Sequence, residues 1–366
     1  MRRRSFLKAT GSAGALPVVF TPRAALAGGR VGSDTLRWPK PTGSPVLDSL
    51  RPAIEASRHV RTDLARIAEV ARWMAYEELP FPQFGLPFGL DQDRDQAVDF
   101  ELVSTSINTA FTDFATSVKF QTEYQGRSWS DSQALTACLK RALDRSIPVL
   151  DGRFLAKATR SELAGIFAGN IELPMLDEKL KVLNDVGRVL EQRYGGSFHN
   201  FVKSCSARLY DGGRGLVDRL VAEFPRFNDV SRYHGHEIKL YKLAQLGYWG
   251  LHAGLKSKGG FPIADIASMT AFADYIVPVA LRVMGILVYS PQLDEKIGTR
   301  QLIPRDSEEE IEIRAHMLYA TALLTEDINA LRPPELQLII PQLDARLWLN
   351  YHTTHWPHHL TRTIMY

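Results

Sequence analysis

The chain lacks most features that would assign it to a specialised structural class. It has only two cysteines in 366 residues, which excludes a disulfide-built scaffold and a four-cysteine zinc site and leaves one disulfide, Cys138–Cys205, open. No internal segment approaches the ~20 consecutive apolar residues of a membrane-spanning helix, so we expect no stable membrane insertion. The net charge of +3 is too small to indicate direct binding of nucleic acid.

Several catalytic signatures are also missing. The sequence has no glycine-rich dinucleotide or phosphate loop, no H-E-x-x-H pair and no G-x-S-x-G nucleophile elbow. The histidines gather at 234–236 and 352–359, but their spacing matches no common zinc pattern, so we expect no metal and no other cofactor. The proportion of apolar residues, 45%, is that of an ordinary globular protein with a sizeable core.

The N-terminus has the order of segments found in a twin-arginine export signal. Arg3 and Arg4 are followed by a mildly apolar run, and Ala25-Leu26-Ala27 offers a small-x-small cleavage site. We therefore expect an exported protein that works outside the cytoplasm. A basic disordered tail is the alternative interpretation of these residues.

The remaining sequence predicts one mainly helical domain. We expect a signal peptide at 1–27, a linker at 28–45 and the functional domain at 46–366, because no repeat or composition break divides the last of these. Helices are expected over 46–76, 130–145, 161–168, 175–194, 215–224, 236–255, 308–329 and 336–351. The clearest β signal predicts a small hairpin near 118–129, turning through residues 125–127.

The apolar stretch at 268–290 has the pattern of a buried helix that begins close to Pro278. Val279, Val283 and Ile286 recur at three- and four-residue spacing, and proline is favourable only in a first helical turn. Asp274 then precedes the helix N-terminus, whose dipole should keep a carboxylate ionised and able to face a cation. Asp274 is otherwise no more than a helix cap.

Three further residues have a functional and a structural interpretation. Phe272 can stack on a flat ligand or belong to the core. Lys242, among apolar residues, either faces an anion or extends to the surface. Asp344 can act with Asp274 in cleavage of a glycosidic bond, although the pattern alone favours a surface pair with Arg346.

Short motifs follow one another in a characteristic order from about Val46 to Tyr366. They are Ala142-Leu143-Asp144 with Ile147-Pro148, Tyr194-Gly195-Gly196-Ser197-Phe198, Phe224-Pro225, Tyr241-Lys242 with Ala244-Gln245, Phe272-Ala273-Asp274-Tyr275 with Pro278, Glu310-Ile311-Glu312-Ile313-Arg314, Leu343-Asp344 with Leu347-Trp348, and His359, Arg362 and Tyr366. With these motifs the chain resembles the queuosine salvage proteins, which act as queuosine 5'-phosphate N-glycosylases. The resemblance implies a shape similar to the helical DNA glycosylases, and hydrolysis of queuosine 5'-phosphate to queuine and ribose 5-phosphate.

The resemblance also implies roles for individual residues. Asp274 is expected to be the catalytic nucleophile or transition-state stabiliser, with Phe272 and Asp344 in contact with the base. Charge makes Lys242 and Arg362 the candidates for the phosphate end of the substrate. The full set of expected substrate-binding residues is Phe272, Ala273, Tyr275, Asp344, Lys242, Arg362 and Glu77.

The chain departs from the family pattern at two positions. Leu349, followed by Asn350, stands where the family has a second aspartate, and Glu77 stands where it has a histidine. Both positions are expected to touch queuine's amine-bearing side arm, and Glu77 could serve as a carboxylate partner for that amine. The departures and the export signal favour an alternative function, an exported protein that binds queuine-like bases without catalysis. A third alternative is an inactive helical scaffold.

Overall fold

The computed structural model describes residues 36–82, 86–90, 92–354 and 356–366. The predicted signal peptide and the first residues of the predicted linker lie outside this part. Residues 38–366 form one compact unit, which includes the end of the predicted linker. Trp38 packs there on the ring of Tyr319, with 5.4 Å between centroids, and under the guanidinium of Arg51 at 4.1 Å. The predicted division into signal, linker and domain stays a proposal.

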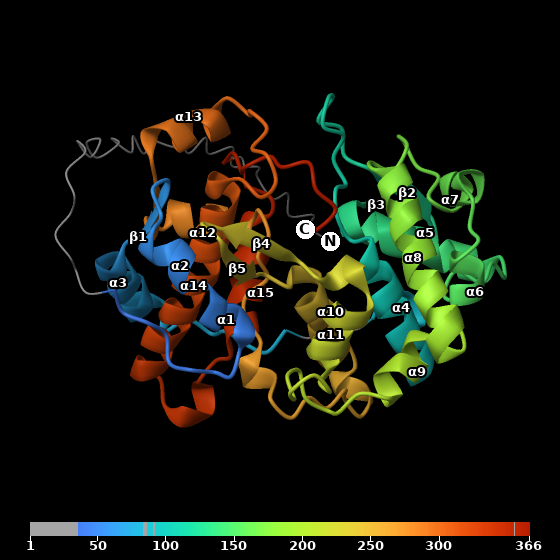
Figure 1. The fold of residues 1–366 in the computed structure, drawn as a ribbon, viewed down its shortest axis with the longest axis horizontal. Helices are drawn as coiled ribbons and strands as arrows, with labels where there is room; N and C mark the ends of the chain where they lie inside the picture. The colour runs from blue at the N-terminus through green and yellow to red at the C-terminus, as the bar shows by residue number, and fades with distance from the viewer. Residues whose placement is uncertain (1–35, 83–85, 91, 355) are drawn as a thin grey trace, which may run out of the picture. The chain divides into compact units, whose positions relative to one another are not determined.

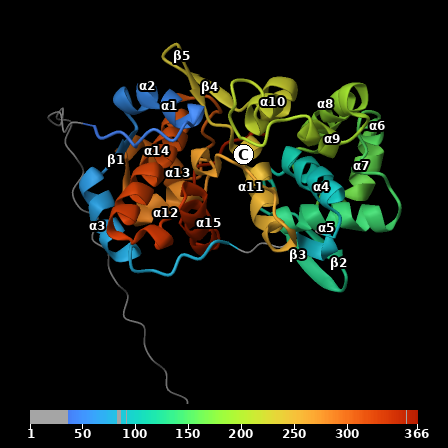
Figure 2. The same ribbon diagram turned by 90° about the horizontal axis from the view of Figure 1, so that it is seen from below.

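One group of helices surrounds the long helix α14 (Figures 1 and 2). Its members are α1 (Pro45–Ser49), α2 (Arg51–Glu55), α3 (Leu64–Met74), α12 (Val277–Val283), α13 (Pro291–Gly298), α14 (Glu308–Leu331) and α15 (Ile340–Tyr351). Residues 309 to 325 of α14 are buried on every side, so this helix forms the centre of the core here rather than a surface layer.

The second group lies on the opposite side of α11 in both views (Figures 1 and 2). It comprises α4 (Arg94–Ser106), α5 (Asp131–Asp144), α6 (Gly152–Leu155), α7 (Arg160–Ile166), α8 (Leu176–Tyr194) and α9 (Phe198–Lys203). Between the groups lie α10 (Leu216–Glu223) and α11 (Lys242–Gly254). Short 3-10 turns are η1 (Pro87–Gly89), η2 (Pro225–Phe227), η3 (Lys256–Lys258), η4 (Ile266–Ser268) and η5 (Pro334–Leu336).

Strands form only three antiparallel pairs, within the described residues. They are β1 (Val60–Thr62) with β6 (Leu287–Tyr289), β2 (Gln121–Tyr124) with β3 (Arg127–Ser130), and β4 (Val230–Tyr233) with β5 (His236–Lys239). The prediction of a mainly helical domain is confirmed. The hairpin predicted near 118–129 is confirmed as β2–β3, whose turn residues Gln125 and Gly126 both have positive φ, as a two-residue hairpin turn requires.

Three predicted helices are wrong in part, and the one expected over 336–351 starts only at Ile340. The helix expected over 236–255 starts only at Lys242, because His234 and Gly235 both have positive φ and turn the preceding residues into the β4–β5 hairpin. The helix expected over 46–76 is divided into α1, α2, β1 and α3. Near β1 the backbone N–H groups of residues 58–60 donate to the Glu312 carboxylate instead of to helical carbonyls.

Two further sequence-level points are settled within the described residues. No helix there is long and apolar enough to cross a membrane. Cys138 and Cys205 are both free thiols, so the disulfide that the sequence left open is not formed.

The side chain of Arg314, in the middle of α14, is fully buried and joins four segments. Its guanidinium pairs with both carboxylate oxygens of Asp229 and, at 3.2 Å, with Glu310. Its Nε donates to the carbonyl oxygen of Ala273 at 3.0 Å, and its Cζ lies 4.1 Å from the centre of the Tyr366 ring. A buried guanidinium needs this full set of partners because desolvation would otherwise make it very unfavourable.

We expect Asp229→Asn to lower the free energy of unfolding by ~3–5 kcal/mol, the usual result of removing one partner of a buried ion pair. Asp294→Asn is the matched control, since Asp294 pairs with Arg282 where half of its side chain is exposed, and such pairs contribute about 1 kcal/mol or less. Denaturant unfolding of both variants checks this. Equal losses would show that Glu310 alone is enough to neutralise Arg314.

Candidate active site

Asp274 lies in the turn before α12, two residues ahead of the N-cap residue Ile276. Its Oδ1 accepts hydrogen bonds from the backbone N–H groups of Ile276 and Val277, at 2.9 and 3.0 Å. The helix starts at Val277, so the predicted start close to Pro278 is confirmed. Among the described contacts of Asp274, Oδ2 takes part in no hydrogen bond, which leaves it available for a ligand.

The helix after Asp274 is shorter than its apolar pattern predicted. It ends at Val283, whose side chain is 38% exposed, and Gly285 then turns the chain with φ of +76°. Ile286 is buried, but it lies beyond the helix, just ahead of β6. The apolar spacing therefore continued across a turn that the glycine makes possible.

Asp344 reaches the same place from α15. It is buried, and its Oδ1 accepts a hydrogen bond at 2.9 Å from the backbone N–H of Phe272. The surface pair with Arg346 favoured by the sequence pattern is wrong, because Arg346 pairs with Glu77 at 2.8 Å. The two acids thus hold one short segment from both ends, Asp344 at residue 272 and Asp274 at residues 276 and 277.

Lys242, the first residue of α11, supplies the positive charge of this group. It is buried, with 8% of its surface exposed, so the alternative that it extends to the surface is wrong. Its ammonium has no hydrogen bond or ion pair at contact distance with another described residue, yet the charges of Asp274 and Asp344 both act on it. Burial lowers the pKa of Lys242 to about 8, and the two carboxylates oppose that shift.

The pKa of Asp274 shifts in the opposite direction from the one expected from the helix dipole. Burial raises the pKa of Asp274, although Lys242 and the N–H groups of Val277 and Ile276 act in the opposite direction. Burial, followed by the charge of Asp274, raises the pKa of Asp344 well above its usual range. Desolvation therefore outweighs the dipole, and Asp344 is the acid that more readily holds a proton.

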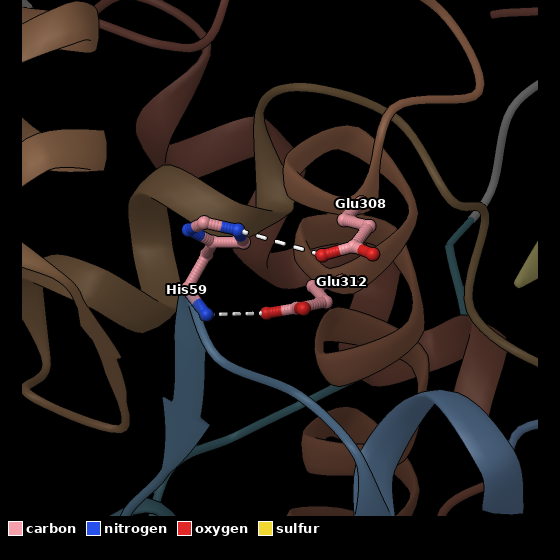
Figure 3. Close-up of side chains that lie close together, drawn as sticks. All are labelled: His59, Glu308 and Glu312. Atoms are coloured by element: carbon pink, nitrogen blue, oxygen red, sulfur yellow. Dashed lines mark hydrogen bonds and ion pairs between the residues drawn. The ribbon is translucent and has the colours of Figure 1, made fainter. Parts of the chain in front are cut away.

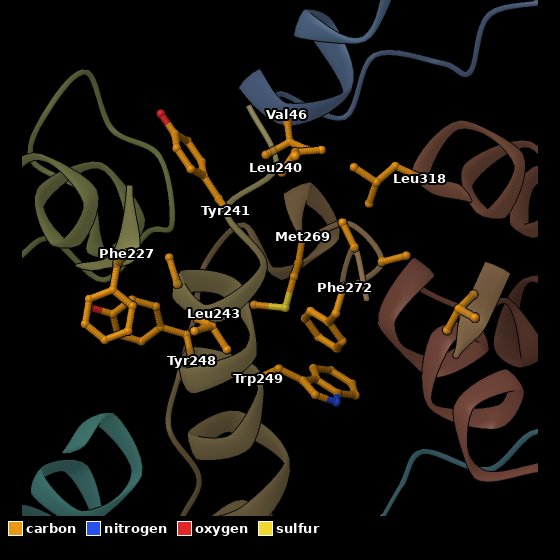
Figure 4. Close-up of a cluster of buried hydrophobic side chains, with 14 of the residues drawn as sticks. Val46, Phe227, Leu240, Tyr241, Leu243, Tyr248, Trp249, Met269, Phe272 and Leu318 are labelled. Atoms are coloured by element: carbon orange, nitrogen blue, oxygen red, sulfur yellow. The ribbon is translucent and has the colours of Figure 1, made fainter. Parts of the chain in front are cut away.

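Phe272 and Trp249 form an aromatic boundary beside these groups. Figure 4 shows the two rings directed toward each other, with Met269 and Leu243 nearby. Phe272 is 4% exposed, so its ring belongs to the buried cluster as well as to the site. Trp249 was not found by sequence reasoning, although it follows Lys242 by seven residues and so lies on the same face of α11.

The other predicted residues lie in different parts of the structure and have different partners. Ala273 offers its carbonyl to Arg314, and the Tyr275 ring lies 4.6 Å from that of His358 at the edge of a cavity of about 80 Å³. Glu77 pairs with Arg346, and Arg362 pairs with Glu178 at 2.7 Å, half exposed. None of the contacts described for Glu77 or Arg362 is to Asp274, Asp344 or Lys242. A larger hollow of about 340 Å³, lined by residues of 164–176, contains none of the predicted site residues.

His59, Glu308 and Glu312 lie close enough together to raise the question of a metal ion (Figure 3). The oxygens of Glu312 already accept hydrogen bonds from the N–H groups of residues 58–60 and from the Tyr233 hydroxyl. Glu308 is paired with His234 at 2.8 Å. We therefore assign this group a structural role in attaching β1 to α14, and the expected absence of a metal stays a prediction.

The fold and site together define a mainly helical protein whose candidate site contains two buried carboxylates, a buried lysine and an aromatic wall. A family model described as "Queuosine salvage protein" matches residues 89–366. A curated protein from Sphaerobacter thermophilus, named queuosine 5'-phosphate N-glycosylase/hydrolase, is 33% identical over 326 residues, 88% of this chain and 97% of its own length. A protein of the same name from Bos taurus is 30% identical over 309 residues, 80% and 86% of the two chains. The chain belongs to the queuosine salvage family.

The raised pKa of Asp344 predicts how stability depends on pH. A carboxyl whose pKa is raised by folding stabilises the folded protein as long as it is protonated. This stabilisation is complete below the unfolded-state pKa, near 3.8, and is lost as the pH rises through the folded-state pKa. Asp344→Asn can still accept the Phe272 N–H but does not titrate. Its melting temperature should therefore rise relative to wild type as the pH increases from 4 to 8.

Asp144→Asn is the control of opposite sign, because a hydrogen bond from Lys140 lowers the pKa of Asp144. That variant should instead keep a nearly constant difference in melting temperature from wild type between pH 4 and 8, because stability from a lowered pKa is lost only as the pH falls below the unfolded-state value near 3.8. If the difference in melting temperature between Asp344→Asn and wild type were the same at every pH, the raised pKa of Asp344 would be contradicted.

Proposed function

We propose that this protein hydrolyses the N-glycosidic bond of queuosine 5'-phosphate, or of queuosine, and releases queuine for salvage. The observation that carries the proposal is the uncommitted Oδ2 of Asp274, held beside Asp344 and Lys242 in a buried site. The names of the relatives from Sphaerobacter thermophilus and Bos taurus support the same reaction.

The mechanism follows from the charges that develop when the bond breaks. Cleavage leaves positive charge on the ribose at C1' and negative charge on the departing base. Asp274 is suited to stabilise the first, because two backbone N–H groups fix its Oδ1 and leave Oδ2 to face C1' without reorganisation. Water then adds its oxygen to C1', and its proton balances the charge of the base.

Asp344 and Phe272 are suited to bind the base. The raised pKa of Asp344 favours a protonated carboxyl, which can donate a hydrogen bond to a base that is gaining negative charge. The Phe272 and Trp249 rings offer apolar faces for a flat heterocycle, and the backbone bond from Phe272 to Asp344 sets the base-binding groups relative to each other.

The two departures from the family pattern lie outside this group of residues. Leu349 is 44% exposed on α15, and Glu77 is bound to Arg346. Neither changes the contacts of Asp274, Asp344 or Lys242. They bear on recognition of the side arm of queuine, and binding of queuine without turnover by the wild-type protein would favour the alternative function of an exported binding protein.

Asp274→Asn should lower kcat for queuosine 5'-phosphate by ~100-fold or more, because it removes the charge that stabilises the transition state. The affinity for queuine should change much less, since the effect arises mainly in the transition state. Asparagine keeps an Oδ1 that can accept from the same two backbone N–H groups, so the melting temperature should not fall. Release of queuine measured by mass spectrometry, together with thermal melts, checks all three.

The matched control is Asp63→Asn, which makes the same change at the cap of α3, where Asp63 accepts from Arg66 N–H at 3.0 Å. This control should keep wild-type turnover. If Asp274→Asn turned over queuosine 5'-phosphate at a near-normal rate, the catalytic assignment of Asp274 would have to be withdrawn.

We further propose that the protein is exported by the twin-arginine route, on the basis of Arg3, Arg4 and the 25–27 cleavage motif. These residues lie outside the described part of the chain. Replacing both arginines with lysine should leave the protein in the cytoplasm, as followed by cell fractionation. Unchanged fractionation of the double variant would reject this route.

A further inference from the structure

The loop at 268–277, which carries the candidate catalytic acid, is attached to the core at several points. At its start the hydroxyl of Ser268 donates to the carbonyl oxygen of Thr42. Two residues further along are held by Asp344 of α15 and by Arg314 of α14. These contacts fix the loop to α14, to α15 and to the segment that precedes α1.

The helix α11 contributes the opposite side of the candidate site. Lys242 and Trp249 are seven residues apart on this helix, so they lie on one of its faces. Figure 4 shows the Trp249 ring directed toward the ring of Phe272, which the loop carries. The space between the two rings, and the separation of Lys242 from Asp274, therefore depend on how the loop is placed against α11.

Gln245 makes the hydrogen bonds that join this helix to the loop. Its Oε1 accepts from the backbone N–H of Thr270 at 2.9 Å, and its Nε2 donates to the hydroxyl oxygen of the same residue, also at 2.9 Å. That hydroxyl in turn donates to the carbonyl oxygen of Ala271 at 2.8 Å. Among the hydrogen bonds described for residues 268–277, those with Gln245 are the only ones that reach α11.

Burial makes the pair of Gln245 and Thr270 resistant to displacement. Neither side chain has any exposed surface. Water cannot replace a partner at this place, so a shift of the loop along α11 would leave buried polar groups without hydrogen bonds, which is unfavourable. Because the amide binds two atoms of one residue at once, the loop can neither slide nor rotate there without breaking at least one of these bonds.

Gln245 is placed to orient the site and not to touch a ligand. It is fully buried, and both polar atoms of its amide are bound to Thr270. It follows Lys242 by three residues and precedes Trp249 by four, which are the spacings of neighbours on one helix face. An effect of Gln245 on the reaction is therefore transmitted through the loop.

We propose that Gln245 and Thr270 are positioning residues that set the spacing between α11 and the loop at 268–277. The pair fixes the gap between the Trp249 and Phe272 rings at a width that admits a flat heterocycle. The inference rests on the proposed function for the identity of that ligand. It goes beyond the proposed function because it assigns selectivity for a flat base to two residues that the base does not touch.

The kinetic test uses Gln245→Met and Thr270→Val, which remove the pairing and nearly keep the side-chain volume. Either change should lower kcat/KM for queuosine 5'-phosphate by about 10-fold or more, because a small displacement of the reacting groups is enough for such a loss. The affinity for queuine, measured by calorimetry, should fall as well, since the gap between the rings is no longer fixed. Thr270→Ser keeps the hydroxyl and should stay close to wild type in both measurements.

The double variant of Gln245→Met and Thr270→Val shows whether the two residues act as one unit. Its kcat/KM should be no lower than that of the poorer single variant, because the first change already breaks the pair. Fully additive losses would show that the residues act independently, which would overturn the proposal.

Asn329→Leu is the matched control for the loss of a reciprocal amide pair. Asn329 donates to the carbonyl oxygen of Leu338 and accepts from its N–H, both at 2.8 Å. This variant should lower the melting temperature but leave kcat/KM and the affinity for queuine close to wild type. If Gln245→Met and Thr270→Val also lost only melting temperature, the pair would have a structural role alone and the proposal would be wrong.

Hydrogen–deuterium exchange of the full-length protein tests the placement of the loop without any ligand. The N–H groups of residues 268–277 should exchange faster in Gln245→Met and Thr270→Val than in wild type, and at the wild-type rate in Asn329→Leu. If wild type does not cleave queuosine 5'-phosphate but the loop responds in this way, the proposed function fails and the positioning pair stands. Unchanged exchange of the loop in both variants rejects the pair, whatever the turnover.

Discussion

The buried ion pair between Arg314 and Asp229 is the interaction on which the rest of the site depends. From the centre of α14, the same guanidinium also holds the carbonyl of Ala273. That contact fixes the residue between Phe272 and Asp274, so the aromatic wall and the candidate catalytic carboxylate are positioned from one point in the core. The arrangement explains why a guanidinium, which is unfavourable to bury, lies in the interior. Asp229 neutralises its charge, and its hydrogen bond to Ala273 fixes the loop before α12.

The charges of the interior are not distributed at random. The carboxylates of Asp274 and Asp344 lie in one part of it, and both act on the charge of Lys242. In the proposed reaction the bound ligand gains positive charge at C1' of its ribose, and these carboxylates are complementary to that charge. The desolvation that disfavours each of these groups alone also strengthens its interaction with such a ligand.

The part of the site that is built from residues close together in the sequence could be predicted. Asp274 binds the first N–H groups of α12 because its partners, Ile276 and Val277, are only two and three residues away, within reach of a local pattern. Asp344 accepts from Phe272, 72 residues distant, and no spacing rule distinguishes that bond from a surface pair with Arg346.

The sequence by itself determined the helical class, the β2–β3 hairpin and the start of α12, because hydrogen bonds and turn geometry over a few residues suffice for these. Only the tertiary structure decided that Glu312 captures the N–H groups of residues 58–60 and interrupts a helical pattern there. The tertiary structure also decided which groups are buried, and burial reversed the expected pKa shift of Asp274. Desolvation depends on everything that surrounds a group, which a linear pattern does not contain.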